Sequence, residues 1–271
     1  MFSNRLLLAS RTSDAALVGR LVREGADPNL ADGNGLTPLH LASAHGTLPV
    51  VDCLTGINAV DANKKTLSGC SPLWLACEAN LRTSHLGVVK SLIDHGADVD
   101  LADNGGATPL FMSCQKGDLP VVKWLVETGN ADFKKSTADG CSPVAIAAER
   151  GHDKIVLFFH SVGADLNAAD NAGATAMYLA AQNGHSDTVR SLFAHGGDAN
   201  KAMNNGCTPL TVAAFNGDIR LVHFLFTQAG ANIHHANADG DSAKVVASKA
   251  GHFEVAKLLA QVEELCQNCG R

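Results

Sequence analysis

The stretch "TPLHLA", Thr37 to Ala42, recurs along the chain in closely similar forms. Each copy opens with Thr or Ser, and the openings are Thr37, Ser71, Thr108, Ser142, Thr175, Thr208 and Ser242. Successive openings are 34, 37, 34, 33, 33 and 34 residues apart. One more step back reaches Asn4, after which the apolar pattern continues. A nearly constant period over the whole chain indicates a repeat architecture with units of about 33 residues.

Each unit predicts a tight turn followed by two helices. "DGNG", from Asp32 to Gly35, is a turn because Gly and Asn tolerate positive φ. Thr37 then caps a helix whose first position is Pro38, where the missing N–H costs nothing. Gly46 ends this helix, and a second helix with apolar residues at helical spacing follows.

A unit of this size cannot bury its apolar side alone, so neighbouring units must stack. The pattern resembles the ankyrin repeat, whose T-P-L-H-x-A signature is matched in full by Thr37 to Ala42. The resemblance covers roughly residues 4 to 262. It implies an all-α solenoid of about eight stacked helix-turn-helix units joined by β-hairpin-like turns. It also implies that His40 bonds to backbone near the turn.

The predicted ankyrin repeat domain spans residues 1–262, and a tail with a CxxC motif spans 263–271. The first and last units are expected to cap the stack. The third carries extra residues between Glu78 and Gly87, which predicts a longer loop between its two helices. The units are predicted at about 4–31, 32–63, 64–102, 103–136, 137–169, 170–202, 203–236 and 237–262.

Composition argues against several classes of function. The net charge is −6 and no run of Lys or Arg occurs, which disfavours a nucleic-acid-binding protein. No stretch approaches the roughly 18 apolar residues of a membrane span. The apolar run Leu6 to Ala9 is too short for a secretory signal, and the eight cysteines are scattered. We therefore expect an intracellular protein, cytoplasmic or nuclear, with reduced thiols.

The histidines do not predict a catalytic site. His152, His185 and His252 share one repeat position, directly after the glycine that ends the first helix. A residue that recurs at one position of a repeat belongs to the scaffold. "GNG" at Gly33 to Gly35 lacks the strand that a phosphate-binding loop requires. We therefore predict no catalytic residue, no cofactor and no small-molecule substrate.

The resemblance implies a monomeric scaffold or adaptor that binds a partner protein on its concave face, which turn tips and first helices form. Phe215 takes a position that is mostly polar elsewhere, and aromatic residues are typical interface anchors. Trp74, Phe111 and Tyr178 take the place of His40, and packing in the core stays open for Trp74 and Phe111. The candidate contact residues are Trp74, Phe111, Gln115, Lys116, Glu149, Arg150, Tyr178, Gln182, Asn183, Asn204, Asn205 and Phe215.

The last residues, "CQNCGR", hold Cys266 and Cys269. The pair is open to three interpretations: a frayed tail, a redox or intermolecular thiol pair, or the first half of a zinc module. The zinc interpretation leads to an alternative function. The repeats would then be the targeting arm of a longer regulatory protein, similar to proteins that join ankyrin repeats to a MYND-type finger.

The resemblance also implies a modification. Ankyrin repeats are substrates of an asparaginyl hydroxylase that modifies the Asn ending "GADxN", with Leu eight residues earlier. Asn29, after Leu21, and Asn200, after Leu192, match this pattern.

Overall fold

The computed structural model describes residues 2–79 and 85–269, and the side chains of residues 5–79 and 85–265. Within these ranges every regular element is an α-helix, sixteen in all, which confirms the predicted all-α repeat architecture. The chain forms two compact units, Met1–Ala138 and Asp139–Arg271. The division falls in the turn between the predicted fourth and fifth repeats, so each unit contains four repeats.

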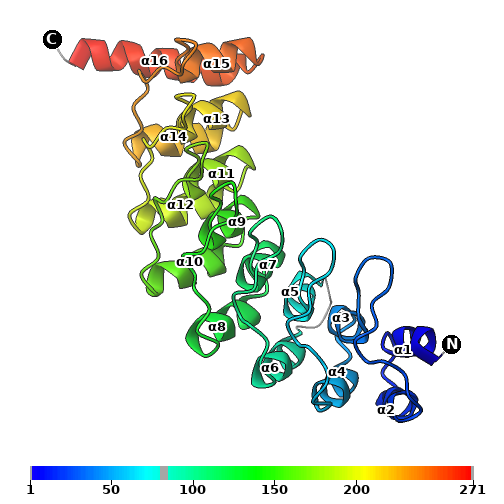
Figure 1. Ribbon diagram of the computed structural model, residues 1–271. Coiled ribbons are helices and arrows are strands. Elements are labelled where there is room, and N and C mark those ends of the chain that lie inside the picture. Colours follow the sequence, from blue (N-terminus) through cyan, green and yellow to red (C-terminus); the bar gives the residue numbers. More distant parts are fainter. Residues whose placement is uncertain (1, 80–84, 270–271) are drawn as a thin grey trace. The chain divides into compact units, whose positions relative to one another are not determined.

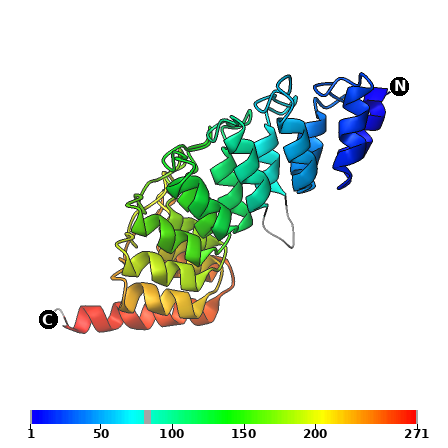
Figure 2. The ribbon, with the colours of Figure 1, turned by 90° about the horizontal axis from the view of Figure 1, so that it is seen from below.

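Unit 1 consists of two layers of helices (Figure 1). The first helices of successive repeats pack on one another, and so do the second helices. Figure 2 shows that the turns between its repeats project from one end of the helices. Its helices are α1 (Phe2–Ala9), α2 (Ala15–Arg23), α3 (Pro38–Ala44), α4 (Leu48–Thr55), α5 (Pro72–Glu78), α6 (Leu86–Asp94), α7 (Pro109–Lys116) and α8 (Leu119–Glu127).

Unit 2 repeats the same arrangement. Its last helix is almost twice as long as the other second helices, because it continues past residue 262, where the predicted repeat domain ends. Its helices are α9 (Pro143–Glu149), α10 (Asp153–Ser161), α11 (Ala176–Gln182), α12 (Ser186–Ala194), α13 (Pro209–Phe215), α14 (Ile219–Thr227), α15 (Ala243–Lys249) and α16 (Phe253–Cys269).

The recurring Thr or Ser caps the first helices from α3 to α13 in the way the sequence predicts, whereas Ser242 before α15 makes no such side-chain bond. In α3 the Thr37 hydroxyl accepts a hydrogen bond from the backbone N–H of His40, and Pro38 occupies the first turn. Side chains of Ser71 and Thr108 cap α5 and α7 in the same manner. Each cap satisfies a backbone N–H that the helix itself leaves unpaired.

The turns between repeats are hairpin-like, as predicted. Isolated antiparallel bridges join Ala169 to Thr175 and Ala236 to Ser242. Neighbouring turns are also tied to each other, because the backbone N–H of Leu67 donates to Asn34 and that of Ala138 donates to Gly105. These bonds satisfy backbone groups that would otherwise rely on water.

His40 joins two repeats. Its side chain is fully buried, and its Nδ1 accepts from the backbone N–H and the hydroxyl of Thr37. Its Nε2 donates to the backbone oxygen of Cys70 in the next repeat, 3.1 Å away. This confirms the predicted bond between His40 and backbone near the turn. Trp74 forms the equivalent joint, since its Nε1 donates to the backbone oxygen of Ala107 at 3.0 Å.

Asparagine side chains form a second set of joints. Asn200 donates to the backbone oxygen of Gly230 and accepts from the backbone N–H of Asn232. Asn29 makes the equivalent pair of bonds to Ala59 and Asp61. Hydroxylation of Asn29 and Asn200 remains a prediction, and it would alter residues that connect consecutive repeats.

Candidate protein-binding surface

The unit 1 candidates differ widely in exposure. Phe111 is buried and Trp74 is half-buried in its joint to the next repeat, which favours the packing role that the sequence left open for both. Gln115 and Lys116 are half-buried at the end of α7. Lys116 pairs with Glu78 of the preceding repeat at 3.1 Å. The surface that unit 1 offers here is therefore mainly polar.

The unit 2 candidates lie at the ends of first helices and at the tip of a turn between repeats. Gln182, Asn183 and Arg150 are exposed, Glu149 is half-buried, and Tyr178 is buried. Arg150 lies 3.5 Å from the carboxylate of Glu149. At the turn tip, Asn204 and Asn205 are exposed, and Nδ2 of Asn204 donates to the backbone of Asn171. Tyr178 therefore contributes little to the surface, whereas the polar residues are accessible.

Phe215 stands out as the sequence predicts. It is the last residue of α13, and 58% of its surface is exposed. Burying an aromatic ring stabilises the folded state, so a ring left in water at this position contributes little to folding.

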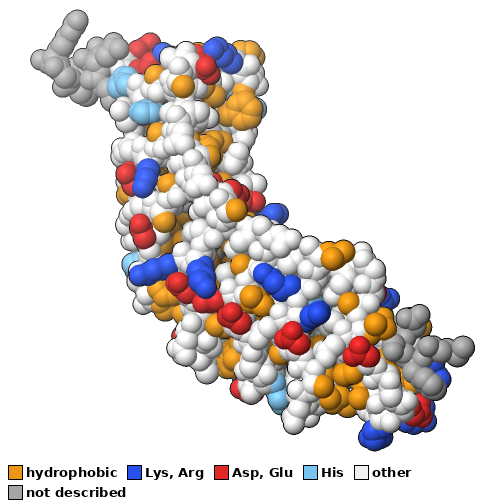
Figure 3. Space-filling view, in the orientation of Figure 1, with side chains coloured by type: hydrophobic (Ala, Val, Ile, Leu, Met, Phe, Trp, Pro, Cys, Tyr) orange, Lys and Arg blue, Asp and Glu red, His pale blue; other side chains and the backbone are white. Residues whose placement is uncertain are grey.

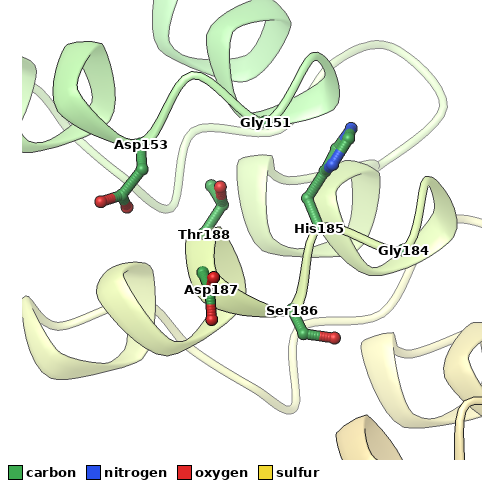
Figure 4. Close-up of a pocket in the computed structure, with 7 residues that line it drawn as sticks. All are labelled: Gly151, Asp153, Gly184, His185, Ser186, Asp187 and Thr188. Carbon is green, nitrogen blue, oxygen red and sulfur yellow. The ribbon is translucent and has the colours of Figure 1, made fainter.

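A polar depression lies where the two helices of repeats 5 and 6 connect (Figure 4). Its volume is about 410 Å³. Asp153 lines it from the first turn of α10, and Ser186, Asp187 and Thr188 line it from the start of α12. His185 lies beside them, close against Gly151 of the preceding repeat.

Repeats 7 and 8 form the same depression with apolar residues. Its volume is about 540 Å³, and its lining residues occupy the same repeat positions. Ile219 stands where repeat 5 has Asp153, and Phe253 stands where repeat 6 has Ser186. Ile219 is 43% exposed and Phe253 is 72% exposed. Figure 3 shows hydrophobic side chains reaching the surface over α13 and α15 in the same part of unit 2.

Ile219 and Phe253 are not among the contact residues that the sequence predicts. The first residue of a second helix is also apolar at Leu48, Leu86 and Leu119 and is polar at Asp153 and Ser186, so the sequence alone does not single out Ile219 and Phe253. We refer to Phe215, Ile219 and Phe253 together as the apolar edge of unit 2.

The histidines after the first helices have a packing role, as predicted. The His185 ring lies so close to Gly151 that a Cβ there would be 2.6 Å from Nδ1. His252 covers Gly217 in the same way, and His85 covers Gly46. Each ring therefore fills the space that a glycine leaves in the preceding repeat.

Two buried histidines predict acid sensitivity. Burial lowers the pKa of His40 and of His85 from 6.5, and the charges of Asp32 and Asp118 oppose this only in part. These two histidines therefore bind protons near pH 6.5 in the unfolded chain but not in the folded chain. Stability is complete above pH 6.5 and falls as pH drops toward the folded-state values, by up to about 1.4 kcal/mol per pH unit for each histidine.

Urea denaturation between pH 7.5 and 5.5 checks this expectation. His85→Asn should flatten the slope, because Asn still suits the first position before α6 but does not titrate. His45→Asn is the control, since His45 is exposed and its ring bonds to the backbone oxygen of Leu41 within its own helix. A slope unchanged by His85→Asn would remove His85 from the explanation.

The cysteines with described side chains are free thiols. Burial raises the pKa of Cys77 to about 12, so this thiol stays protonated at neutral pH. The side chains of Cys266 and Cys269 lie outside the described residues, although their backbone forms the end of α16. Zinc binding at this pair therefore stays a prediction. Within the described part of the chain, no helix has the length and apolar character needed to cross a membrane.

Comparison with known proteins agrees with the geometry. A family model described as "Ankyrin repeats (3 copies)" matches residues 6–103, 82–170 and 145–237. The chain is 31% identical over 170 residues to the nuclear factor NF-kappa-B p105 subunit of Gallus gallus, which covers 61% of this chain and 17% of that protein.

Two further relatives are named as a palmitoyltransferase and a potassium channel. The palmitoyltransferase AKR1 of Lachancea kluyveri is 34% identical over 147 residues, which covers 51% of this chain and 19% of that protein. The potassium channel AKT1 of Arabidopsis thaliana is 35% identical over 181 residues, which covers 57% of this chain and 21% of that protein. The matched segment is thus a small part of each relative. The chain belongs to the ankyrin repeat family.

Proposed function

We propose that the chain is a non-catalytic scaffold or adaptor that binds a partner protein through the apolar edge of unit 2. Ankyrin repeats are generally protein-interaction modules and are generally not catalytic. From this edge, the contact would extend over the ends of the first helices and over the turns between repeats. These elements form the concave side in ankyrin repeats. The exposed side chains Gln182, Asn183 and Asn204 would form its polar rim.

The contrast between the two equivalent depressions supports this proposal most directly. The scaffold tolerates Asp153 and Ser186 at these positions, so folding does not require Ile219 and Phe253 there. Fully burying a Phe or Ile side chain contributes about 1.5–3 kcal/mol. Much of that free energy remains available at the apolar edge, because its three side chains are 43% to 72% exposed.

The polar rim would add specificity. Asn216 connects the edge to the preceding repeat, since its Nδ2 donates to the backbone oxygen of Gln182 at 2.8 Å. Lys249 lies in the next repeat and is exposed, although it pairs with Asp241. An apolar centre with a hydrated polar rim is the usual anatomy of a protein interface.

The test is to give the edge the residues that the chain already uses elsewhere. Ile219→Asp with Phe253→Ser copies repeats 5 and 6, and Phe215→Gln copies Gln182. Each variant should bind the partner at least tenfold more weakly, because a central hot-spot residue is worth 2 kcal/mol or more. The partner is first isolated with the parent chain, and affinities are then measured by surface plasmon resonance.

Asp153→Ala is the matched control, because it alters the polar depression at the equivalent position. It should leave the affinity unchanged, and all variants should keep the parent's melting temperature within a few degrees. Equal affinity for the parent and both edge variants would overturn the proposal. A large loss of thermal stability in Phe215→Gln would instead assign Phe215 to folding.

A further inference from the structure

Two histidine rings lie against each other where second helices of unit 2 end, whereas Ile219 and Phe253 of the apolar edge lie where second helices begin. His160 is in the last turn of α10, and His195 directly follows α12 in the next repeat as its C-terminal cap. Their ring centroids are 4.6 Å apart, and the ring planes are tilted by 58°. Both side chains are exposed. We propose that His160 and His195 bind one divalent transition-metal ion of the Cu²⁺, Ni²⁺ and Zn²⁺ class.

The hydrogen bonding of His195 leaves a ligand atom available. Its Nδ1 lies 2.7 Å from the backbone oxygen of Ser191. Since a carbonyl oxygen only accepts, Nδ1 carries the proton and Nε2 presents its lone pair. Proteins orient metal-binding imidazoles in this way, with one nitrogen donating to a carbonyl and the other binding the ion.

The spacing of the rings matches joint coordination. With metal–nitrogen bonds of about 2.0–2.1 Å, the centroids of two imidazoles bound side by side to one ion lie roughly 4.5–5.2 Å apart. The observed separation of 4.6 Å falls in this range, so coordination needs little movement of either helix.

The surrounding backbone favours a cation and holds the two helices in place. Both rings lie at the carboxyl ends of helices, where unpaired carbonyl groups create a partial negative charge. Asn167 donates to the backbone oxygen of Gly196, the residue after His195, and accepts from the backbone N–H of Asp198. These bonds connect repeats 5 and 6 beside the histidine pair, so the spacing of the two helix ends that carry the rings is set before an ion arrives.

The chemistry of the ligands selects the class of ion. Imidazole nitrogen suits Cu²⁺, Ni²⁺ and Zn²⁺, whereas Mg²⁺ and Ca²⁺ prefer oxygen. Among the described residues no group of three or more His, Cys, Asp or Glu is placed to hold a metal, so water would complete the coordination. Affinity should then rise from Co²⁺ to Ni²⁺ to Cu²⁺.

The test is a calorimetric titration of the whole chain with Ni²⁺ at pH 7.5. His160→Ala and His195→Ala should each weaken one-site binding at least tenfold. His223→Ala is the matched control, because this histidine is also exposed on a second helix of unit 2 but packs against Phe226. A Cys266→Ser/Cys269→Ser variant identifies any separate thiol site.

The proposal is supported if binding survives in the His223 and cysteine variants and is lost in both His160→Ala and His195→Ala. Electron paramagnetic resonance with Cu²⁺ should then show coupling to two imidazole nitrogens. Equal Ni²⁺ binding by the parent, His160→Ala and His195→Ala would overturn the proposal, as would no binding to the parent. Loss of binding only in the cysteine variant would also overturn it and would place the metal at the end of α16. Melting temperatures without metal confirm that each variant is folded.

Discussion

Replacing His40 by alanine is expected to lower the free energy of unfolding by about 3–5 kcal/mol. The imidazole is fully buried and serves three groups, namely the backbone N–H and hydroxyl of Thr37 and the backbone oxygen of Cys70. Alanine leaves these groups without their partner in a site that has lost the ring. A buried polar group without a hydrogen bond costs about 1–3 kcal/mol, and the cavity adds to that cost.

Urea denaturation followed by circular dichroism measures the change. His45→Ala is the matched control, because His45 lies next to the end of the same helix, bonds to Leu41 within its own repeat and is exposed. We expect the control to cost less than about 1 kcal/mol, in line with surface substitutions. Equal losses for the two variants would show that the joint to Cys70 contributes little.

Replacing Gly106 by alanine is expected to lower the free energy of unfolding by about 2–4 kcal/mol. Gly106 has a φ of +83°, a conformation that L-residues adopt only at a cost. A Cβ would also lie 2.9 Å from the backbone nitrogen of Ala138 in the next turn. The obstacle is backbone rather than a flexible side chain, so the two turns would have to move apart.

The neighbouring Gly105 provides the control. It does not have positive φ, and a Cβ there would meet only a carboxylate oxygen of Asp103 at 3.4 Å. Gly105→Ala should change stability by no more than about 0.5 kcal/mol, because alanine also restricts the unfolded chain. Thermal and urea denaturation measure the loss of stability in both variants. A similar loss for the two substitutions would contradict the explanation from backbone contact.

Much of the local structure could be predicted because the same capping, proline and glycine residues recur in successive repeats. Thr37, Pro38 and Gly46 specify where a first helix begins and ends, and equivalent residues do so along the chain. Capping, proline placement and positive φ depend on a few adjacent residues, so the sequence pattern predicts them directly. The structure confirms these elements in the described part of the chain.

The role of the residues at the His40 position could not be settled in this way. Trp74 at this position could anchor a partner or join repeats. Only the structure shows its Nε1 bonded to Ala107, and the burial of Phe111 and Tyr178. Exposure depends on how closely the next repeat packs, and that distance is not encoded in any single repeat. Aromatic residues at the same repeat position can therefore differ in whether they are exposed at the surface.

The sequence by itself determined the period, the two helices of each repeat, the caps and turns, and the unusual character of Phe215. These follow from short-range rules that act within one repeat. The tertiary structure decided what neighbouring repeats do together. It brought Ile219 and Phe253 into one depression and His160 against His195, and it showed which side chains join repeats. Contacts between repeats connect residues about 33 positions apart, and only the packed backbone sets their distances.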